Sequence, residues 1–558
     1  MQRKTLAVWF ILLGLALGLL GNLFFYNKFL GLSFPLFITI AVLVVLAASK
    51  PAQTTVNWRN LWLVGPLLIF SVMVAVHSNP LTTLLHMGAV LTLGALGLHY
   101  MAVSRPLDEA TLGEQAGAVL EAGMLTPFAA IPELGDSWGW LRERSWQGRT
   151  LIAVARGLMI GVPVVVVFAV LLGSADVVFA DYVSAAWNLF AFNLDVRLID
   201  QGLITLAIGW VSTGALAYGL ARRPTLTRGA AIAQDEESDE PQAYFVQGDE
   251  DAVPMDVEDV DIPPKRKTGA GFRLGIIETG IVLGLVDVLF GVFVLVQFAY
   301  FFGGQNTLSA TGLTYAEYAR RGFFELSAVS VMTLGLVLWL DYVTIRREKR
   351  ENRVFTILSV ILVALTTVML VSASQRMYLY EEVFGFTHLR VLVHVFILWL
   401  GVLFGVFLLS MFRLKKSIFA FGVLLVCIGY LLTLNVMNLD LYIAEHNIAR
   451  FRQGYALDLS FLGELSADAA PAVVMLFEEN ENNPEAQEWA GQWIARELRK
   501  LDAQQTGDSL FSFNLARSQA WTLLDGLRDK LPDYDPYMFL SSSAYDIYAA
   551  TEVAPGSR

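Results

Sequence analysis

The sequence has little charge and almost no cysteine. Asp, Glu, Lys and Arg make up 16% of its 558 residues, against about 25% in soluble globular proteins. The single cysteine, Cys427, excludes an intramolecular disulfide and a cysteine-based zinc cluster. The formal net charge of −12 excludes a nucleic-acid binder with a broad basic surface. This composition also argues against a soluble enzyme and a disordered chain.

The sequence also lacks the short motifs that name a reaction. It has no HExxH, no CxxC, no P-loop and no GxGxxG opening a helix after a strand. Its six histidines show no metal-ligand spacing. We therefore predict no metal and no cofactor.

Long apolar segments are what the chain does contain. Hydrophobic residues make up 55% of it, and the mean hydropathy is +0.55. A bilayer core of about 30 Å needs roughly 20 apolar residues in a helix. The sequence predicts an all-α, polytopic transmembrane helix bundle in contact with the lipid bilayer. Its spans are eleven segments near residues 5–26, 32–48, 61–77, 82–103, 151–172, 202–221, 273–302, 323–345, 354–373, 389–412 and 417–438.

The placement of Lys and Arg predicts the orientation of the bundle. With the N-terminus in the cytoplasm, 23 of these residues fall on the inner side of the predicted spans and 6 on the outer side. Eleven spans with this orientation place residues 439–558 outside the cytoplasm. A miscount of one span would reverse that placement.

The predicted organisation has six parts. Asn483 and Pro484 predict a helix start in the last part, and a stripe of Trp489, Trp493, Leu498 and Leu501 predicts its core. The parts are four spans (1–103), a cytoplasmic amphipathic loop with one or two short helices (104–150), two spans (151–221), a disordered acidic cytoplasmic linker (222–272), five spans with polar outer loops (273–442), and a small extracytoplasmic helical domain (443–558).

Four ionisable residues fall within predicted spans: Asp287, Glu278, Arg156 and His394. Such residues are costly in lipid and are functional candidates by default. Asp287, near the middle of its span, is either a proton or cation site or a protonated residue that packs through hydrogen bonds. Glu278 and Arg156 lie at similar depth and suggest a structural pair.

The predicted outer face carries a second group of polar residues. Sequence-distant segments end there at one depth with Arg, Tyr, acidic and Asn side chains, which predicts a polar pocket. Tyrosines alone would fit an interfacial belt, and salt-bridged loops would explain the charges equally well. The candidates are Asp176, Tyr315, Glu317, Arg320, Arg321, Glu325, Arg376, Tyr380, Glu381, Arg390, Asn438 and Asp440.

Four phrases in these segments carry a family resemblance. LGSADVVF, YAEYARRGFFEL, QRMYLYEEVFGFTHLR and NLDLYIAEHNIARF occur in this order between residues 151 and 480. Together they resemble a bacterial membrane family catalogued as domain of unknown function 4173, which has a close relative numbered 4153. The resemblance implies a multi-pass protein of the bacterial cytoplasmic membrane and supplies no activity.

These observations leave three functions open. The first is a non-enzymatic membrane protein that binds a ligand or partner, such as a lipid headgroup or another membrane protein, at its outer face and relays that binding. The second is a membrane enzyme acting on an anionic lipid-linked substrate at the outer leaflet, with Asp440 or Glu381 as the acid–base group. The third is a proton-coupled secondary transporter that uses Asp287. We rank them in this order.

Overall fold

The computed structural model describes most of the helical chain. The predicted span 151–172 and the acidic linker 222–272 lie outside the described residues. The chain divides into two compact units, Met1–Pro224 with Cys427–Arg558, and Thr225–Val426. The described residues are 3–52, 54, 56–103, 106–144, 196–221, 274–302, 323–413, 416–479, 483–505, 510–531 and 546–547.

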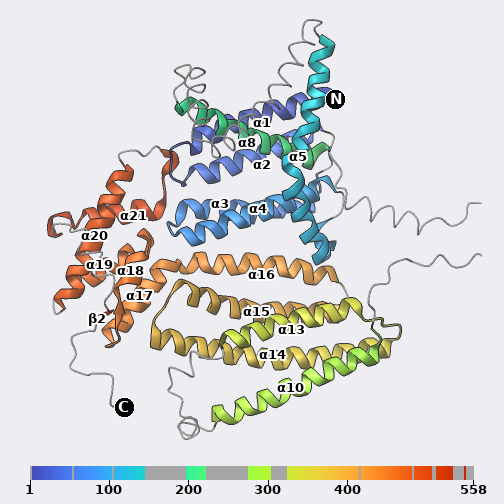
Figure 1. The fold of residues 1–558 in the computed structure, drawn as a ribbon, viewed down its shortest axis with the longest axis vertical. Helices are drawn as coiled ribbons and strands as arrows, with labels where there is room; N and C mark the ends of the chain where they lie inside the picture. Colours follow the sequence, from blue (N-terminus) through green and yellow to red (C-terminus); the bar gives the residue numbers. More distant parts are fainter. Residues whose placement is uncertain are drawn as a thin grey trace, which may run out of the picture. The chain divides into compact units, whose positions relative to one another are not determined.

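The first unit begins with the long apolar helices of the N-terminal part (Figure 1). Its core gathers Phe10, Leu216 and Tyr218, all of which are buried. The helices are α1 (Arg3–Phe25), α2 (Ser33–Ser49), α3 (Val64–Val76), α4 (Pro80–Ala102), α5 (Leu112–Arg144) and α8 (Val196–Ala221), with short 3₁₀ helices at Trp58–Leu63 and Leu107–Glu109.

Helices α1 and α8 pack closely because α1 presents glycine at two successive turns. A Cβ atom on Gly14 would lie 2.8 Å from the carbonyl oxygen of Gly209. One on Gly18 would lie 2.2 Å from the carbonyl oxygen of Thr205. Neither position can accept a side chain without moving the backbone of α8, so this small-xxx-small pair sets the helix separation.

Helix α5 differs from the short amphipathic helices predicted for residues 104–150. It runs unbroken for 33 residues, with Pro127 and Pro132 inside it. The indole Nε1 of Trp210, on α8, donates to the Pro127 carbonyl at 2.8 Å. Packing against the neighbouring helices, including α1, α4 and α8, offsets the helix-breaking tendency of the two prolines.

The last part of the first unit is a group of helices that we call the C-terminal helical module. Two-residue strands, β1 (Leu457–Asp458) and β2 (Asp546–Ile547), pair within it. In Figure 1 its helices gather at one end of α1–α4. They are α17 (Leu439–Arg452), α18 (Leu459–Glu464), α19 (Ala470–Glu479), α20 (Pro484–Gln505) and α21 (Leu515–Asp525), with short 3₁₀ helices at Ala467–Ala469, Leu510–Ser512 and Arg528–Lys530.

The predicted helix start at Pro484 is confirmed. Asn483 caps α20 by accepting a hydrogen bond from the Ala486 amide at 3.2 Å, and Trp489 and Trp493 are buried in the module core. The last α-helix of the module, α21, ends at Asp525, and a 3₁₀ turn follows.

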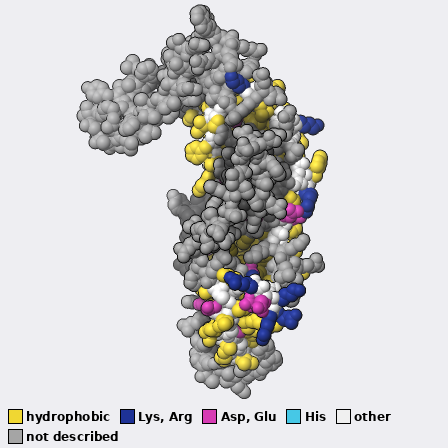
Figure 2. All heavy atoms as spheres, turned by 90° about the vertical axis from the view of Figure 1, so that its right-hand side faces the viewer, with side chains coloured by type: hydrophobic (Ala, Val, Ile, Leu, Met, Phe, Trp, Pro, Cys, Tyr) yellow, Lys and Arg dark blue, Asp and Glu magenta, His cyan; other side chains and the backbone are white. Residues whose placement is uncertain are grey.

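The second unit contains α10 (Ile276–Phe302), α13 (Phe323–Val343), α14 (Lys349–Phe384) and α15 (His388–Arg413). Helix α16 (Lys416–Met437) carries the chain back to the first unit. Basic residues are concentrated between α13 and the start of α14, from Arg346 to Arg353. Figure 2 shows Lys and Arg side chains gathered with Asp and Glu in the lower part of its view, over this turn.

Helix α14 extends beyond the span predicted at 354–373. Its 36 residues would measure roughly 54 Å at 1.5 Å per residue, which is longer than a bilayer core is thick. The predicted polar loop after residue 373 is therefore helical as far as Phe384. The helix ends where Gly385 adopts a φ of 82°, a conformation that favours glycine.

Within the described residues, nine helices are long and apolar enough to cross a membrane. Helix α2, at 17 residues, falls below that length, and the predicted span 151–172 is not described, so the count of eleven stays a prediction. Large apolar side chains on α10 point outward at helical spacing, which suits contact with lipid. They include Ile277, Ile281, Leu285, Val288, Val292 and Leu295. The described chain is that of an integral membrane protein.

Candidate functional site: a buried acidic network at the α3–α4 turn

The turn between α3 and α4 is the centre of the site. Asn79 precedes Pro80, the first residue of α4, and its Oδ1 accepts a hydrogen bond from the Thr82 amide at 3.0 Å. This is the N-cap arrangement expected of Asn before a helix whose first residue is Pro. The cap leaves the amide Nδ2 of Asn79 available for a second partner.

That second partner is Asp440, in the first turn of α17. Asn79 Nδ2 donates to Asp440 Oδ1 at 2.6 Å, and the Ser466 amide donates to Asp440 Oδ2 at 2.9 Å. Asp440 is 1% exposed. The positive end of the α17 dipole adds to the stabilisation of its negative charge. One amide side chain thus joins the start of α4 to the C-terminal helical module.

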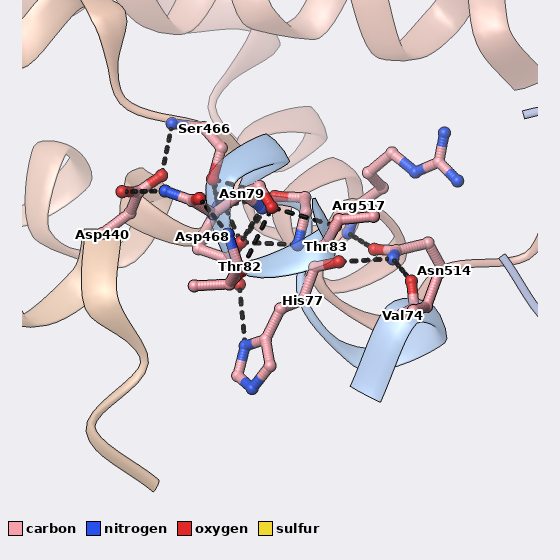
Figure 3. A network of polar contacts seen from close by, with 11 residues as sticks. Val74, His77, Asn79, Thr82, Thr83, Asp440, Ser466, Asp468, Asn514 and Arg517 are labelled. Atoms are coloured by element: carbon pink, nitrogen blue, oxygen red, sulfur yellow. Dashed lines mark hydrogen bonds and ion pairs between the residues drawn. The ribbon is translucent and has the colours of Figure 1, made fainter. Parts of the chain in front are cut away.

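Asp468 binds the backbone of the same turn (Figure 3). Its Oδ2 lies 2.6 Å from the Ser78 amide, 2.7 Å from Ser78 Oγ, 3.1 Å from the Asn79 amide and 3.0 Å from Ser466 Oγ. The Asp468 amide donates in return to Ser78 Oγ at 3.2 Å. Hydrogen bonds to a buried carboxylate are among the stronger ones in proteins, so these contacts hold the turn against the module.

The surroundings of Asp468 favour its charged form. Burial alone would raise the pKa of this carboxyl group. His77, whose Nδ1 lies 3.5 Å from Oδ1, and the two donors of Ser78 outweigh burial and hold the pKa below its ordinary value. Asp468 therefore stays ionised at neutral pH, with its charge distributed over donors from the α3–α4 turn.

A second asparagine repeats this arrangement at α21. Asn514 caps α21 by accepting from the Arg517 amide at 3.1 Å, and its Nδ2 donates to the carbonyl oxygens of Val74 and His77 at 3.2 and 2.9 Å. These carbonyls belong to the C-terminal end of α3, where helices leave acceptors unpaired. The cap of a module helix therefore also closes the end of α3.

The loop between α1 and α2 joins the same interface. The Leu32 amide donates to the Phe513 carbonyl at 2.8 Å, and Arg517 Nη2 donates to the Leu30 carbonyl at 2.8 Å. A Cβ atom on Gly31 would lie 2.3 Å from the Phe513 carbonyl oxygen, so this close approach requires glycine. The module thus binds two helix-connecting loops at the same end of the N-terminal helices.

Below the turn, α4 carries a buried histidine. The ring of His86 lies 6.5 Å from that of His77 and 6.1 Å from that of Phe70, measured between centroids. His86 is 1% exposed, and among the described residues its Nδ1 has no hydrogen-bond partner. A titratable ring thus lies close beneath the residues that hold the module.

The structure assigns the predicted pocket residues to different places. Asp440 belongs to the network above, and Asn438 is the N-cap of α17 with a left-handed φ of 48°. Glu325 lies in the first turn of α13. The pocket as a whole is not tested and stays a prediction. Arg376, Tyr380, Glu381 and Arg390 lie on α14 and α15 in the second unit, and Asp176, Tyr315, Glu317, Arg320 and Arg321 lie outside the described residues.

Two of the α14–α15 residues, Tyr380 and Arg390, do come together. Arg390 donates to the carbonyl oxygens of Phe384 and Gly385 at 2.8 and 2.6 Å, and its guanidinium lies 4.5 Å from the centre of the Tyr380 ring. Arg390 therefore closes the C-terminal end of α14. Glu381, one residue after Tyr380, contacts His394 of α15.

The intramembrane candidates have different surroundings. Asp287 is buried, and neither carboxylate oxygen has a hydrogen-bond partner among the described residues. Glu278 is exposed, and its carboxylate folds back toward Gly275 at the start of its own helix. Arg156 lies outside the described residues, so the predicted pair with Glu278 is not tested.

Sequence reasoning missed most of the network. Ser78, Asn79, Asp468 and Asn514 were not predicted, although Asn79-Pro80 repeats the Asn-Pro signal that predicted α20. That signal indicates that the Asn Oδ1 caps a helix, and it does not show what the amide Nδ2 binds.

Comparisons with known proteins give a family and no activity. Among the described residues, no group of three or more His, Cys, Asp or Glu side chains could hold a metal ion. No curated protein and no solved structure matches the chain. The family found is the relative numbered 4153, so the resemblance to the family numbered 4173 is not confirmed. The chain belongs to the family described as Domain of unknown function (DUF4153), whose model matches residues 64–476.

Proposed function

We propose that the C-terminal helical module binds a ligand or protein partner and relays that binding to the membrane helices through the α3–α4 turn. The observation that carries the proposal is the double role of Asn79, which caps α4 and donates to Asp440. A displacement of the module breaks the bond to Asp440 and disturbs the cap of α4. The start of a membrane helix and the state of the module are thereby coupled.

The surroundings of the turn support this proposal. Asp468 and Asn514 bind the turn and the end of α3, so movement of the module changes both helices together. The buried His86 lies next to His77 on the membrane side of these contacts. The hydrogen bonds of Asp440 and Asp468 join the turn to the module at several points, so they form together when the module is docked and are lost together when it undocks.

We also propose that the docked end faces away from the cytoplasm in a bacterial cytoplasmic membrane. The loops that contact the module, near residues 27–32 and 77–79, carry one basic residue, Lys28. The turn between α13 and α14 carries Arg346, Arg347 and Lys349. The bias in Lys and Arg supports an outer position for the loops that the module binds.

Hydrogen exchange on the purified full-length protein tests the coupling. Asp468→Asn removes the negative charge and places an amide among hydrogen-bond donors. We expect the Thr82 and Thr83 amides at the start of α4 to exchange at least 10-fold faster, because the cap loosens together with the docking contacts. Faster exchange confined to the module, with these two amides unchanged, would show that docking is not relayed to α4.

Asp458→Asn is the matched control. Asp458 is an exposed N-cap in the same module and accepts from the Phe461 amide at 2.9 Å. Since Asn caps helices as well as Asp does, we expect this variant to leave the exchange of Thr82 and Thr83 at its parent rate.

Asp287 favours a second candidate function, proton-coupled transport. Among the described residues no hydrogen-bond donor reaches this buried carboxyl group, a costly feature in a membrane helix that suits a site taking up and releasing protons. Solute-driven proton flux in liposomes, absent in Asp287→Asn, is the result that this function predicts. The absence of flux in the parent protein for every solute tested would count against it.

A further inference from the structure

Three side chains of the second unit form a hydrogen-bonded series across α14 and α15. Ser374 Oγ lies 3.2 Å from His394 Nε2, and His394 Nδ1 lies 2.7 Å from Glu381 Oε2. Ser374 and Glu381 are seven residues apart on α14, so they face the same side two turns apart. His394 reaches between them from α15. A nucleophile, a base and an orienting acid are thus connected in the order that serine hydrolases use.

The hydrogen bonds assign a role to each atom. In the tautomer with its proton on Nδ1, His394 donates to Glu381 Oε2, and the lone pair on Nε2 is then directed at Ser374 Oγ. Other hydroxyl groups on α14 behave differently: Thr366 and Thr367 donate to the carbonyl oxygens four residues earlier. Ser374 is directed at the imidazole, which can accept its proton.

Exposure increases from the acid to the base. The side chain of Glu381 is 3% exposed and that of His394 is 28% exposed, and Ser374 is half-buried. Large apolar side chains near the serine and the histidine in sequence, Val371 on α14 and Leu398 on α15, are strongly exposed. The reactive end of the series is therefore open, on helices whose surroundings are apolar.

The position of Ser374 along α14 points to the class of substrate. No charged residue occurs between Arg353 and Arg376, so Ser374 lies at the boundary between the apolar and polar parts of the helix. The acyl ester groups of lipids lie at the corresponding boundary of a bilayer, between the chains and the headgroups. A lipid ester can thus reach this depth without leaving the membrane.

We propose that Ser374, His394 and Glu381 form a catalytic site that hydrolyses an acyl ester of a lipid. Ser374 Oγ bonds to the ester carbonyl carbon while its proton passes to His394 Nε2. The C–O bond to the alcohol then breaks, and the alcohol leaves with that proton. Water, deprotonated by His394 Nε2, then attacks the acyl-serine, and the fatty acid is released as Ser374 Oγ takes the proton back. Glu381 acts as a positioning residue that holds the imidazole.

An alkyl fluorophosphonate, which phosphonylates activated serines, is the direct probe. With the full-length protein in lipid nanodiscs, we expect a dodecyl probe to label Ser374, identified by peptide mass spectrometry. Labelling should fall at least 100-fold in Ser374→Ala and at least 10-fold in His394→Gln. It should stay unchanged in Ser372→Ala, the matched control two residues earlier on α14.

Further variants distinguish activation of Ser374 by His394 and Glu381 from a purely structural role of these residues. Glu381→Ala should slow labelling at least 10-fold, and Glu381→Gln should restore part of the rate, because its amide oxygen can accept from Nδ1–H. A short-chain, water-soluble fluorophosphonate should react more slowly than the dodecyl probe, and equal rates would exclude a lipid substrate. No labelling of Ser374 in the folded parent protein, or labelling indifferent to His394→Gln, would overturn the proposal.

Discussion

Two buried aspartates of this protein show how surroundings decide what a buried acid does. Asp468 is 4% exposed and Asp287 is 9% exposed, so both have lost most contact with solvent. Asp468 lies within hydrogen-bonding distance of four donor atoms, whereas the oxygens of Asp287 have no partner among the described residues. Burial costs a carboxylate its hydration in both places, and hydrogen-bond donors compensate for that cost at one of them.

Of the substitutions that test this comparison, Asp468→Ala should cause the largest loss of stability. It leaves the Ser78 and Asn79 amides without their acceptor, and we expect a loss of about 3 kcal/mol in the free energy of module opening. Hydrogen exchange of the module helices measures this loss. Asp458→Ala, which removes an exposed helix cap, should cost about 1 kcal/mol. Equal losses in the two variants would show that the donors around Asp468 add nothing beyond a cap.

A smaller loss is expected from Asn79→Ala. The substitution removes the α4 cap and the hydrogen bond to Asp440 together, so we expect a cost of about 2 kcal/mol. Asn483→Ala, which removes the cap of α20, should cost about 1 kcal/mol in the same exchange experiment. If the two asparagines cost the same, the bond from Asn79 to Asp440 contributes no net stability.

Lowering the pH should weaken the docking at Asp468 by protonating its carboxylate, without removing the side chain. Its pKa is lowered on folding, so its stabilising effect is fully present above the ordinary value of 3.8 and is lost as the pH falls through the lowered value. His77, the residue that follows α3, faces this carboxylate, and Asp440 also contacts Ser466 and Asn79. The difference in opening free energy between the parent and Asp468→Asn should therefore shrink as the pH falls below about 4. A difference that persists at the lowest pH would contradict this assignment.

The smallest effect is expected at Asp287. Asp287→Asn keeps the shape of the side chain, and no hydrogen bond among the described residues is lost. We expect the free energy of unfolding to change by less than about 1 kcal/mol. Thermal unfolding of the two proteins in the same detergent makes the comparison. A loss as large as that of Asp468→Ala would show that Asp287 is ionised and paired.

The fold was more predictable from the sequence than the site. Apolar segments of about 20 residues mark membrane helices directly, and Asn483-Pro484 marked the start of α20. Glycine spacing shows the limit of such patterns: Gly14 and Gly18 lie against the backbone of α8, whereas nothing contacts a Cβ built on Gly401 or Gly405, which have the same spacing. Two glycines four residues apart show that a second helix could pack closely, and they leave open whether such a helix is there.

The site escaped prediction because its contacts join residues far apart in the chain. Ser78 and Asp468 are 390 positions apart, and Asn514 and Val74 are 440 apart. Of this network, Asp440 was predicted as a site residue, from its depth at the end of a span. Ser374 was missed because a serine in an apolar helix has no distinctive pattern until His394 faces it.

An engineered disulfide across the docking contact tests the central claim most directly. Ser78 Oγ and Ser466 Oγ lie 3.0 Å apart, so Ser78→Cys with Ser466→Cys, in a Cys427→Ser background, places two thiols in reach of each other. We predict that the bond forms in intact cells without added oxidant, because the docked end faces an oxidising compartment. Each single-cysteine variant is the control. Two free thiols that remain uncrosslinked even with added oxidant, in a folded protein, would contradict the docking of the module on the α3–α4 turn.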